Sequence, residues 1–196
     1  MILPIVAYGD PVLKRKALPI SENYEGLDQL IASMWETMYH AHGVGLAAPQ
    51  IGKSIRLFVI DGSPFADDED ATPSDQLVLK TFKKVFINAE MITEEGDDFS
   101  FTEGCLSIPD VREDVTRPSA IRLRYLDENF KEHVEEYSGL AARIIQHEYD
   151  HIEGILFTDK LSPLKKRLIK GRLDKISRGM VESDYRMKFY TKSKKR

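Results

Sequence analysis

The segment over residues 146–151 reads Gln-His-Glu-Tyr-Asp-His and contains the pattern His-Glu-x-x-His. Side chains four residues apart share one face of an α-helix, so a helix here brings the imidazoles of His147 and His151 together. The carboxylate of Glu148 then stands beside them. Two neutral nitrogen ligands and an adjacent carboxylate are suited to binding a metal ion that activates water. The pattern therefore predicts the metal-binding helix of a hydrolase.

Apolar residues surround this pattern within the same predicted helix. Leu140 and Ile144 share a face with the two histidines, which predicts an apolar pocket floor one to two turns from the ion. The opposite side is also apolar, with Ala141, Ile145 and Ile152. We therefore expect a central helix that is buried on all sides.

Two other helices are predicted from apolar residues that recur three and four positions apart. The first runs from about residue 25 to 42 and ends at Gly43. The second is basic and amphipathic, and it begins after Ser162-Pro163. For the central helix, Ser138 is the expected N-terminal cap.

Short β-rich runs predict strands over residues 55–60 and 85–87. Alternating apolar and polar residues predict an antiparallel hairpin between residues 121–125 and residues 133–137. The acidic stretch over 63–76 has little apolar periodicity and is predicted to be a surface loop. Together these elements predict an α+β fold, with mostly antiparallel sheets around the central helix and a helix towards each terminus.

The size of the chain, 196 residues of which 42% are hydrophobic, is that of one domain with its own core. We expect a catalytic domain over residues 1–164, with residues 165–196 as a basic C-terminal helix and tail of the same domain. No apolar run reaches membrane-spanning length, and the first residues lack the features of a secretory signal. The expected location is therefore cytoplasmic, without a membrane partner.

Charge is distributed unevenly along the chain. Residues 160–196 contain 14 Lys and Arg against three acids, whereas the whole chain has a net charge of −4. A basic tail on an acidic body suggests a polyanionic partner for the tail. The alternative is a solvated helix with a frayed, lysine-rich end.

A catalytic zinc-type site uses three protein ligands, so a third must lie outside the helix. Phe157 stands where a metzincin has its third histidine. Glu153 is too near to the pattern, and Glu182 lies in the basic tail. The remaining candidate is the single cysteine, Cys105, in the segment Glu-Gly-Cys-Leu-Ser-Ile-Pro over residues 103–109. A lone cysteine can also be a small core residue.

A third distinctive segment, residues 43–50, reads Gly-Val-Gly-Leu-Ala-Ala-Pro-Gln. It is so rich in small residues that we expect a closely packed loop, not a core strand, in which Gln50 supplies a neutral amide. A phosphate-binding loop is disfavoured because no Gly-Lys-Ser/Thr ending follows.

Taken together and in this order, the three segments closely resemble the signature motifs of peptide deformylases, over roughly residues 2–165. The resemblance implies an α+β fold and a metal-dependent hydrolase that removes the N-formyl group from the N-terminal formylmethionine of newly made proteins, releasing formate. Two alternatives remain: an endopeptidase that uses the same His-Glu-x-x-His pattern, and a binding module with a structural metal. A structural zinc site normally has four protein ligands, and three candidates are visible.

The resemblance also implies roles for individual residues. The implied metal ligands are Cys105, His147 and His151. The implied catalytic groups are Glu148 as acid and base, Gln50 and the backbone amide of Leu106 as oxyanion donors, and Gly45 close to the formyl group. The implied substrate-side residues are Val44, Phe101, Leu140 and Ile144 around the methionine side chain, with Glu103 and Arg112 as a supporting pair. Arg143 departs from the pattern, because we expect an apolar pocket residue there.

The implied cofactor is one divalent metal ion, Fe(II) in the cell, while a thiolate with two imidazoles also suits Zn(II), Ni(II) or Co(II). The implied partner is the nascent chain that carries formylmethionine. The basic segment over 165–196 is consistent with contact to ribosomal RNA near the exit of the nascent chain.

Overall fold

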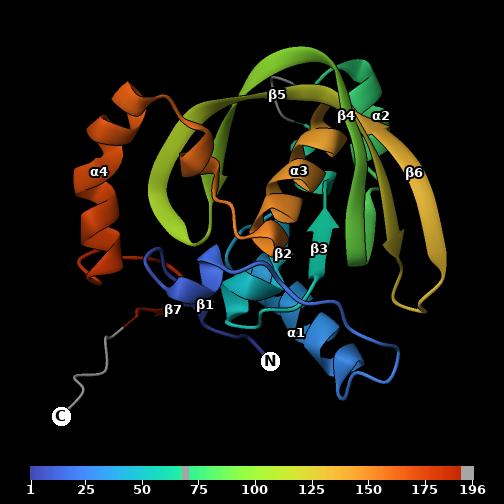
Figure 1. Cartoon of the computed structure of the whole chain (residues 1–196), viewed down its shortest axis with the longest axis horizontal. Helices are drawn as coiled ribbons and strands as arrows, with labels where there is room; N and C mark the ends of the chain where they lie inside the picture. The colour runs from blue at the N-terminus through green and yellow to red at the C-terminus, as the bar shows by residue number, and fades with distance from the viewer. Residues whose placement is uncertain (68–70, 191–196) are drawn as a thin grey trace.

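A five-stranded antiparallel sheet and a helix packed against it form the centre of the molecule (Figure 1). The structure is a computed structural model that describes residues 1–67 and 71–190. In the described part the strands follow one another across the sheet as β2 (Gly45–Ala47), β3 (Leu57–Asp61), β4 (Lys83–Cys105), β5 (Ile108–Leu126) and β6 (Glu132–Ser138). The α+β fold with a mostly antiparallel sheet is therefore confirmed.

The long hairpin of β4 and β5 curves over the central helix (Figure 1). Its register is interrupted at four places, between Ile87 and Glu90 first and between Gly104 and Cys105 last. Such irregularities bend a strand and increase its twist, which lets two long strands wrap around a helix. The predicted hairpin of 121–125 with 133–137 is confirmed, with Ile121 opposite Tyr137.

The α-helices of the described residues are α1 (Leu27–His40), α2 (Pro73–Leu79), α3 (Gly139–Glu153) and α4 (Pro163–Ser177). Short 3-10 turns lie at η1 (Pro11–Lys14), η2 (Ala48–Ile51), η3 (Ser63–Phe65) and η4 (Phe157–Lys160). The helix predicted over 25–42 is α1, although His42 and not Gly43 takes the left-handed conformation after it, with φ of 55°. The helix predicted after Ser162 is α4, and the Ser162 side chain accepts a hydrogen bond from the Lys165 amide.

Helix α3 carries His147, Glu148 and His151, and eleven of its fifteen residues are buried. Its apolar residues, Leu140 among them, pack against the inner face of β4 and β5, in a core that also contains Phe58 and Phe86. Helix α1 covers a second core with β2 and β3, and α4 packs with the N-terminal segment in a third. Within the described ranges, no helix is both long enough and apolar enough to cross a bilayer.

Two predictions about local structure were wrong. Part of the segment over 63–76 is helical, since it contains η3 and the start of α2, while residues 68–70 of the predicted loop lie outside the described residues. The small-residue segment includes the buried strand β2, which pairs with β3 along its whole length. Helices α1 and α3 both contact this strand and cover Leu46 and its neighbours. Little space is left for side chains there, which explains why so many residues of the segment are small.

The expected cap at the start of α3 was also wrong, because the Ser138 side chain makes no capping hydrogen bond. Asp75 of α2 serves instead: its Oδ1 accepts a hydrogen bond of 2.9 Å from the Leu140 amide. The other oxygen of Asp75 accepts from the Thr72 amide at the start of α2. Gly139, with φ of 59°, lets Asp75 approach, since a Cβ atom there would lie 2.2 Å from Oδ1. One carboxylate thus satisfies free amides at two helix starts.

Candidate metal centre

The three predicted metal ligands lie together at one end of the β4–β5 hairpin. Cys105 ends β4, whereas His147 and His151 project from successive turns of α3. One ligand atom from each residue lies within 4.8 Å of the other two, and Cys105 Sγ is 3.3 Å from His151 Nε2. A thiolate with two imidazoles is a donor set suited to a divalent transition metal, and three protein ligands leave one coordination position for water or substrate.

Glu103 orients the first of these histidines. Its Oε2 accepts a hydrogen bond of 2.9 Å from His147 Nδ1, which leaves Nε2 of that ring as the ligand atom. Burial alone would raise the pKa of Glu103, but hydrogen bonds from Arg117 and His147 outweigh it and hold the pKa well below its usual range. Glu103 is therefore an anion throughout the working pH range, and it stabilises one tautomer of His147.

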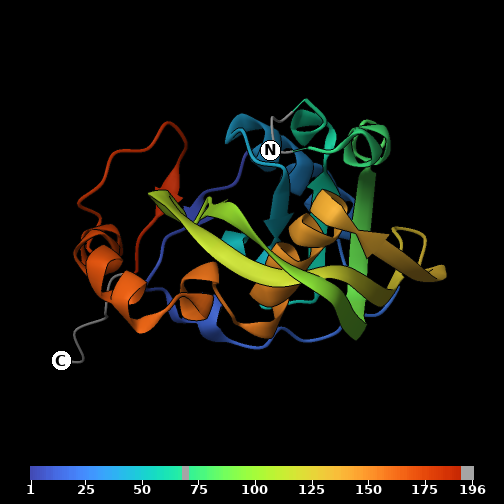
Figure 2. The same cartoon turned by 90° about the horizontal axis from the view of Figure 1, so that it is seen from above.

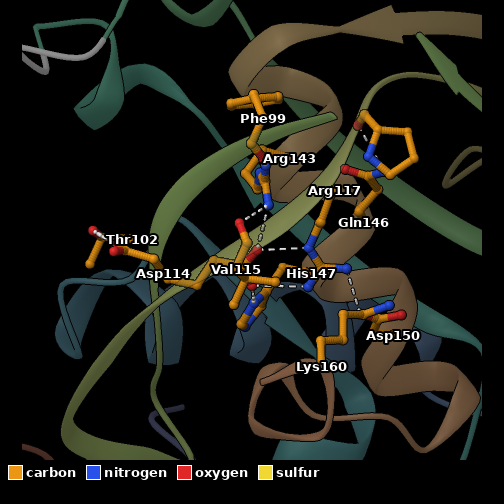
Figure 3. A network of polar contacts seen from close by, with 12 residues as sticks. Phe99, Thr102, Asp114, Val115, Arg117, Arg143, Gln146, His147, Asp150 and Lys160 are labelled. Carbon is orange, nitrogen blue, oxygen red and sulfur yellow. Dashed lines mark hydrogen bonds and ion pairs between the residues drawn. The ribbon is translucent and has the colours of Figure 1, made fainter. Parts of the chain in front are cut away.

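Arg117 and Arg143, two buried arginines that Figure 3 labels, both donate hydrogen bonds to Glu103. Arg117 donates to both carboxylate oxygens, at 2.7 and 2.9 Å, and a third donor reaches Asp150 of α3 at 2.6 Å. Paired two-point contacts of this kind fix a carboxylate in direction as well as in position. The network ties β4 and β5 to α3 directly behind the metal ligands.

The resemblance implied that Glu103 and Arg112 act as a supporting pair. Among the described residues the ion-pair contacts of Glu103 are with Arg117, Arg143 and His147, and none joins it to Arg112. Successive strand residues point to opposite faces, and on β5 the odd-numbered positions are buried here, as at Val115 and Arg117. Arg112 occupies an even, exposed position. Strand alternation could have distinguished the two arginines, but their charge alone could not.

Arg143 is the departure noted in the sequence, and it is 2% exposed. Its guanidinium donates to Glu103 at 3.0 Å, to the Val115 carbonyl at 3.0 Å and to the Phe99 carbonyl at 2.6 Å. Its Cζ lies 4.3 Å from the centroid of the Phe99 ring. A cation is thus accommodated in an otherwise apolar region by acceptors from both long strands and by one aromatic face.

Glu148 lies buried between the histidines, with 4% of its surface exposed. Burial raises its pKa to about 7. Its Oε2 is buried and has no hydrogen-bond partner among the described residues, as expected if that oxygen faces a water or a substrate atom. This unpaired oxygen and the donor set of the neighbouring residues both fit a site that holds a metal ion and a water molecule.

Gly45 and Gln50 complete this end of the cavity. A Cβ atom on Gly45 would lie 2.3 Å from Oε1 of Glu148, so the close approach requires glycine. Gln50 is 1% exposed, and its Oε1 accepts a hydrogen bond of 2.8 Å from the Ala47 amide. That contact turns the NH2 group of Gln50 towards Cys105 Sγ, 3.5 Å away.

A cavity of about 500 Å³ opens onto these residues. Most of the predicted site residues line it, namely Val44, Gly45, Gln50, Phe101, Glu103, Cys105, Leu106, Arg112, Ile144, His147 and Glu148. Leu140 lies instead in the core behind the cavity, and His151 is buried beneath it. The cavity wall also contains residues that the sequence did not indicate, among them Phe65 and residues 182–185.

Comparisons with known proteins agree with this geometry. A family model described as polypeptide deformylase matches residues 2–167. The chain is 60% identical over 196 residues to the peptide deformylase of Christiangramia forsetii, covering 100% of both chains. It is 57% identical over 194 residues to that of Flavobacterium psychrophilum, covering 99% of this chain and 100% of the relative.

Solved structures are similar as well. The peptide deformylase from Thermus thermophilus superposes with a TM-score of 0.78 at 38% identity, covering 92% of this chain and 100% of the other. The enzyme from Legionella pneumophila gives a TM-score of 0.76 at 38% identity, covering 92% of this chain and 98% of the other.

Proposed function

Because the chain belongs to the polypeptide deformylase family, we propose that Cys105, His147 and His151 hold its metal ion and that Glu148 transfers the protons of the reaction. The chain is a metal-dependent hydrolase that removes the N-formyl group from the N-terminus of newly made proteins, and an endopeptidase is not favoured. The observation that carries the residue assignment is the cluster of one sulfur and two ring nitrogens within 4.8 Å beside a buried carboxylate.

The proposed physiological ion is Fe(II), and the same thiolate and imidazoles suit Zn(II), Ni(II) and Co(II). When bound, a divalent ion lowers the pKa of water from about 16 to near 7 and polarises a carbonyl group. Glu103 supports the ion by fixing His147, and contacts of this kind change metal affinity by about 10- to 100-fold when they are removed.

Glu148 acts as general base and then as general acid. As a carboxylate it takes a proton from the attacking water, and as a neutral acid it returns that proton to the leaving amine. A pKa near 7 matches both tasks at neutral pH. Gly45 allows this carboxylate to lie against the chain of β2, next to the place where the formyl group binds.

The oxyanion that forms on the formyl oxygen is stabilised by the Gln50 side chain and the Leu106 backbone amide. Donors held in place before the reaction contribute roughly 3 to 4 kcal/mol each in comparable sites. The hydrogen bond from the Ala47 amide to Gln50 supports this role, because it fixes the amide so that its NH2 group points towards Cys105 Sγ and Ser107 Oγ, at 3.5 and 3.4 Å.

The methionine side chain of the substrate binds against Val44, Phe101 and Ile144, which line the cavity. Leu140 supports this wall from the core behind it. Arg112, on the exposed side of the cavity, contacts the substrate beyond its first residue. The peptide that follows methionine lies towards the open mouth, where the nascent chain continues.

The assay that tests this assignment uses protein purified without oxygen, with its metal content measured. Formate release from formyl-Met-Ala-Ser is expected, and the unformylated peptide should remain intact. Glu148→Ala should retain the metal and lose nearly all turnover. Cleavage inside the unformylated peptide, or full activity of the Glu148→Ala variant, would refute the assignment.

We also propose that the enzyme works in the cytoplasm and contacts ribosomal RNA through α4, whose exposed face is basic. The outer positions of this helix include Arg167, Arg172 and Lys175. Residues 165–190 belong to the catalytic domain, since Ile169 and Ile176 pack with Val6 and Phe157 in one core. Residues 191–196 of the predicted tail lie outside the described residues.

Changing Arg167, Arg172 and Lys175 together to glutamate tests the ribosome contact without removing that core. The matched control changes Lys53, Lys80 and Lys131, which are exposed elsewhere, by the same total charge. Co-sedimentation with ribosomes at low salt should weaken in the first variant alone. Equal binding of the two variants would refute docking through α4.

A further inference from the structure

The chain after α4 returns to the body of the molecule and borders the cavity. We call residues 181–188 the C-terminal strap. It ends in β7 (Met187–Lys188), which pairs in parallel with β1 (Ile5–Val6). Two further backbone hydrogen bonds of 2.9 Å hold it there, from Ile5 to the Arg186 carbonyl and from Ala7 to the Lys188 carbonyl. In Figure 2 the red strap lies beside the tip of the long β4–β5 hairpin.

One side chain of the strap touches the catalytic end of that hairpin. The Tyr185 hydroxyl donates a hydrogen bond of 2.7 Å to the Leu106 carbonyl, across 79 residues of sequence. Tyr185 is partly buried and packs against the core formed by α1, β2 and β3. Burial raises the pKa of Tyr185 to about 12, so its hydroxyl remains a neutral donor at any pH at which the enzyme works.

The hairpin tip is held from outside at two successive carbonyls. The Tyr185 hydroxyl donates to the Leu106 carbonyl, and the Tyr8 amide donates to the Ser107 carbonyl at 2.8 Å. Residues 106 and 107 connect the two strands directly after the metal ligand Cys105. The Leu106 carbonyl lies in the planar peptide unit between residues 106 and 107, and the Leu106 N–H group lies in the unit between residues 105 and 106. The two units meet at the Leu106 Cα atom, so holding the first in place restricts the rotation of the second.

We propose that Tyr185 is a positioning residue for deformylation, which acts by fixing the Leu106 residue so that its N–H group is aimed at the formyl oxygen. The rest of the strap, with Glu182 and Asp184, forms one wall of the substrate cavity. This inference rests on the oxyanion role proposed for Leu106. A donor that is correctly aimed strengthens most as charge develops on the oxygen, so its alignment affects turnover more than binding.

Tyr185→Phe is the informative variant, because it removes one oxygen atom and keeps the packed ring. The net value of an ordinary hydrogen bond corresponds to a change of about 2- to 12-fold. We expect kcat for formyl-Met-Ala-Ser to fall by about 3- to 10-fold, with KM unchanged. Metal content and the thermal midpoint of unfolding should stay close to those of the wild type.

Tyr190→Phe is the matched control, since Tyr190 lies five residues later and is 43% exposed. It should behave as the wild type in every measurement. An unchanged kcat in Tyr185→Phe would overturn the positioning role. Loss of metal from Tyr185→Phe would overturn it as well. So would equal changes in kcat and in thermal midpoint in the two variants, because a structural effect alone would then explain the result.

The wild-type and Gln50→Ala proteins separate this inference from the proposed function. Absence of formate release by the wild type would refute the proposed function itself. Full activity of Gln50→Ala would refute the oxyanion site. If the wild type is active and Gln50→Ala is impaired, the result for Tyr185→Phe bears on the strap alone.

Discussion

Gly45 lies directly against the Glu148 side chain, and a Cβ atom added to Gly45 would stand 2.3 Å from the Glu148 carboxylate oxygen Oε1. Gly45→Ala should therefore displace Glu148 and leave the metal ligands in place. A displacement of about 1 Å in a reacting group lowers turnover by about 100-fold. We expect that loss in the formate-release assay, with normal metal content.

Gly171→Ala is a control for this change, because a Cβ atom there meets no atom within 4 Å and the residue lies in α4. Alanine favours a helix over glycine, so this variant should be as active as the wild type and slightly more stable. Wild-type activity of Gly45→Ala would contradict the contact with Glu148.

The pKa of Glu148 predicts how activity depends on pH. Since burial raises that pKa to about 7, and only the carboxylate can accept a proton, kcat/KM should rise with pH and level off above the pKa. A bound cation favours the carboxylate, so the midpoint should lie at or below about 7. Initial rates between pH 5 and 9 test this. A profile that falls with rising pH across this range would contradict Glu148 as the base.

Glu103 predicts a loss of stability in acid. Its pKa in the folded protein is below its ordinary value of 4.5, so its contribution is fully present above about pH 4.5 and is lost as pH falls further. Urea unfolding between pH 7 and 3.5 should show a smaller decline for Glu103→Gln than for the wild type. At pH 7, Glu103→Gln should unfold about 3 kcal/mol more easily, since two buried arginines lose the negative charge of Glu103.

Glu90→Gln is the matched control, because Glu90 pairs with Arg124 at the exposed surface. Exposed pairs contribute at most about 1 kcal/mol, so this variant should follow the wild type at every pH. Identical acid profiles for Glu103→Gln and the wild type would show that the buried carboxylate does not contribute in this way.

Arg143→Leu should be strongly destabilising although it places an apolar residue in an apolar region. The change removes the side-chain donor of the Val115 and Phe99 carbonyls and of buried Glu103, and each buried group left unpaired costs about 1 to 3 kcal/mol. Chemical denaturation should show a loss of about 2 to 5 kcal/mol. Arg122→Leu, at an exposed position, should stay within about 0.5 kcal/mol of the wild type. A stable Arg143→Leu protein would mean that these carbonyls find other partners.

Local sequence patterns predicted most of the elements and most of the metal centre. The spacing of His147 and His151 specifies their common face, because a helix repeats every 3.6 residues wherever it lies. The pairing of β5 with β6 follows similarly from alternation and a turn. The role of Cys105 rested on the resemblance to a family, since its partners are more than 40 residues away.

Contacts between distant segments could not be predicted in this way. Asp75 caps α3 across 65 residues, and no pattern near Ser138 reveals that the local cap is unused. The choice of Arg117 over Arg112 depends on which face of β5 is buried. The strap was missed because the charge of the C-terminal segment indicated an exposed tail. Its position results from backbone pairing with β1 and from packing of Tyr185 and Met187 against residues far away in the sequence.

The position of the strap has a consequence for the order in which the enzyme is made. Residues 182–185 are translated after every other part of the cavity wall, and their place depends on pairing with residues near the start of the chain. A ribosome making this protein therefore produces the proposed metal ligands and the proposed general base before it produces residues 182–185. This wall of the cavity can form only after residues 182–188 have been made and β7 has paired with β1.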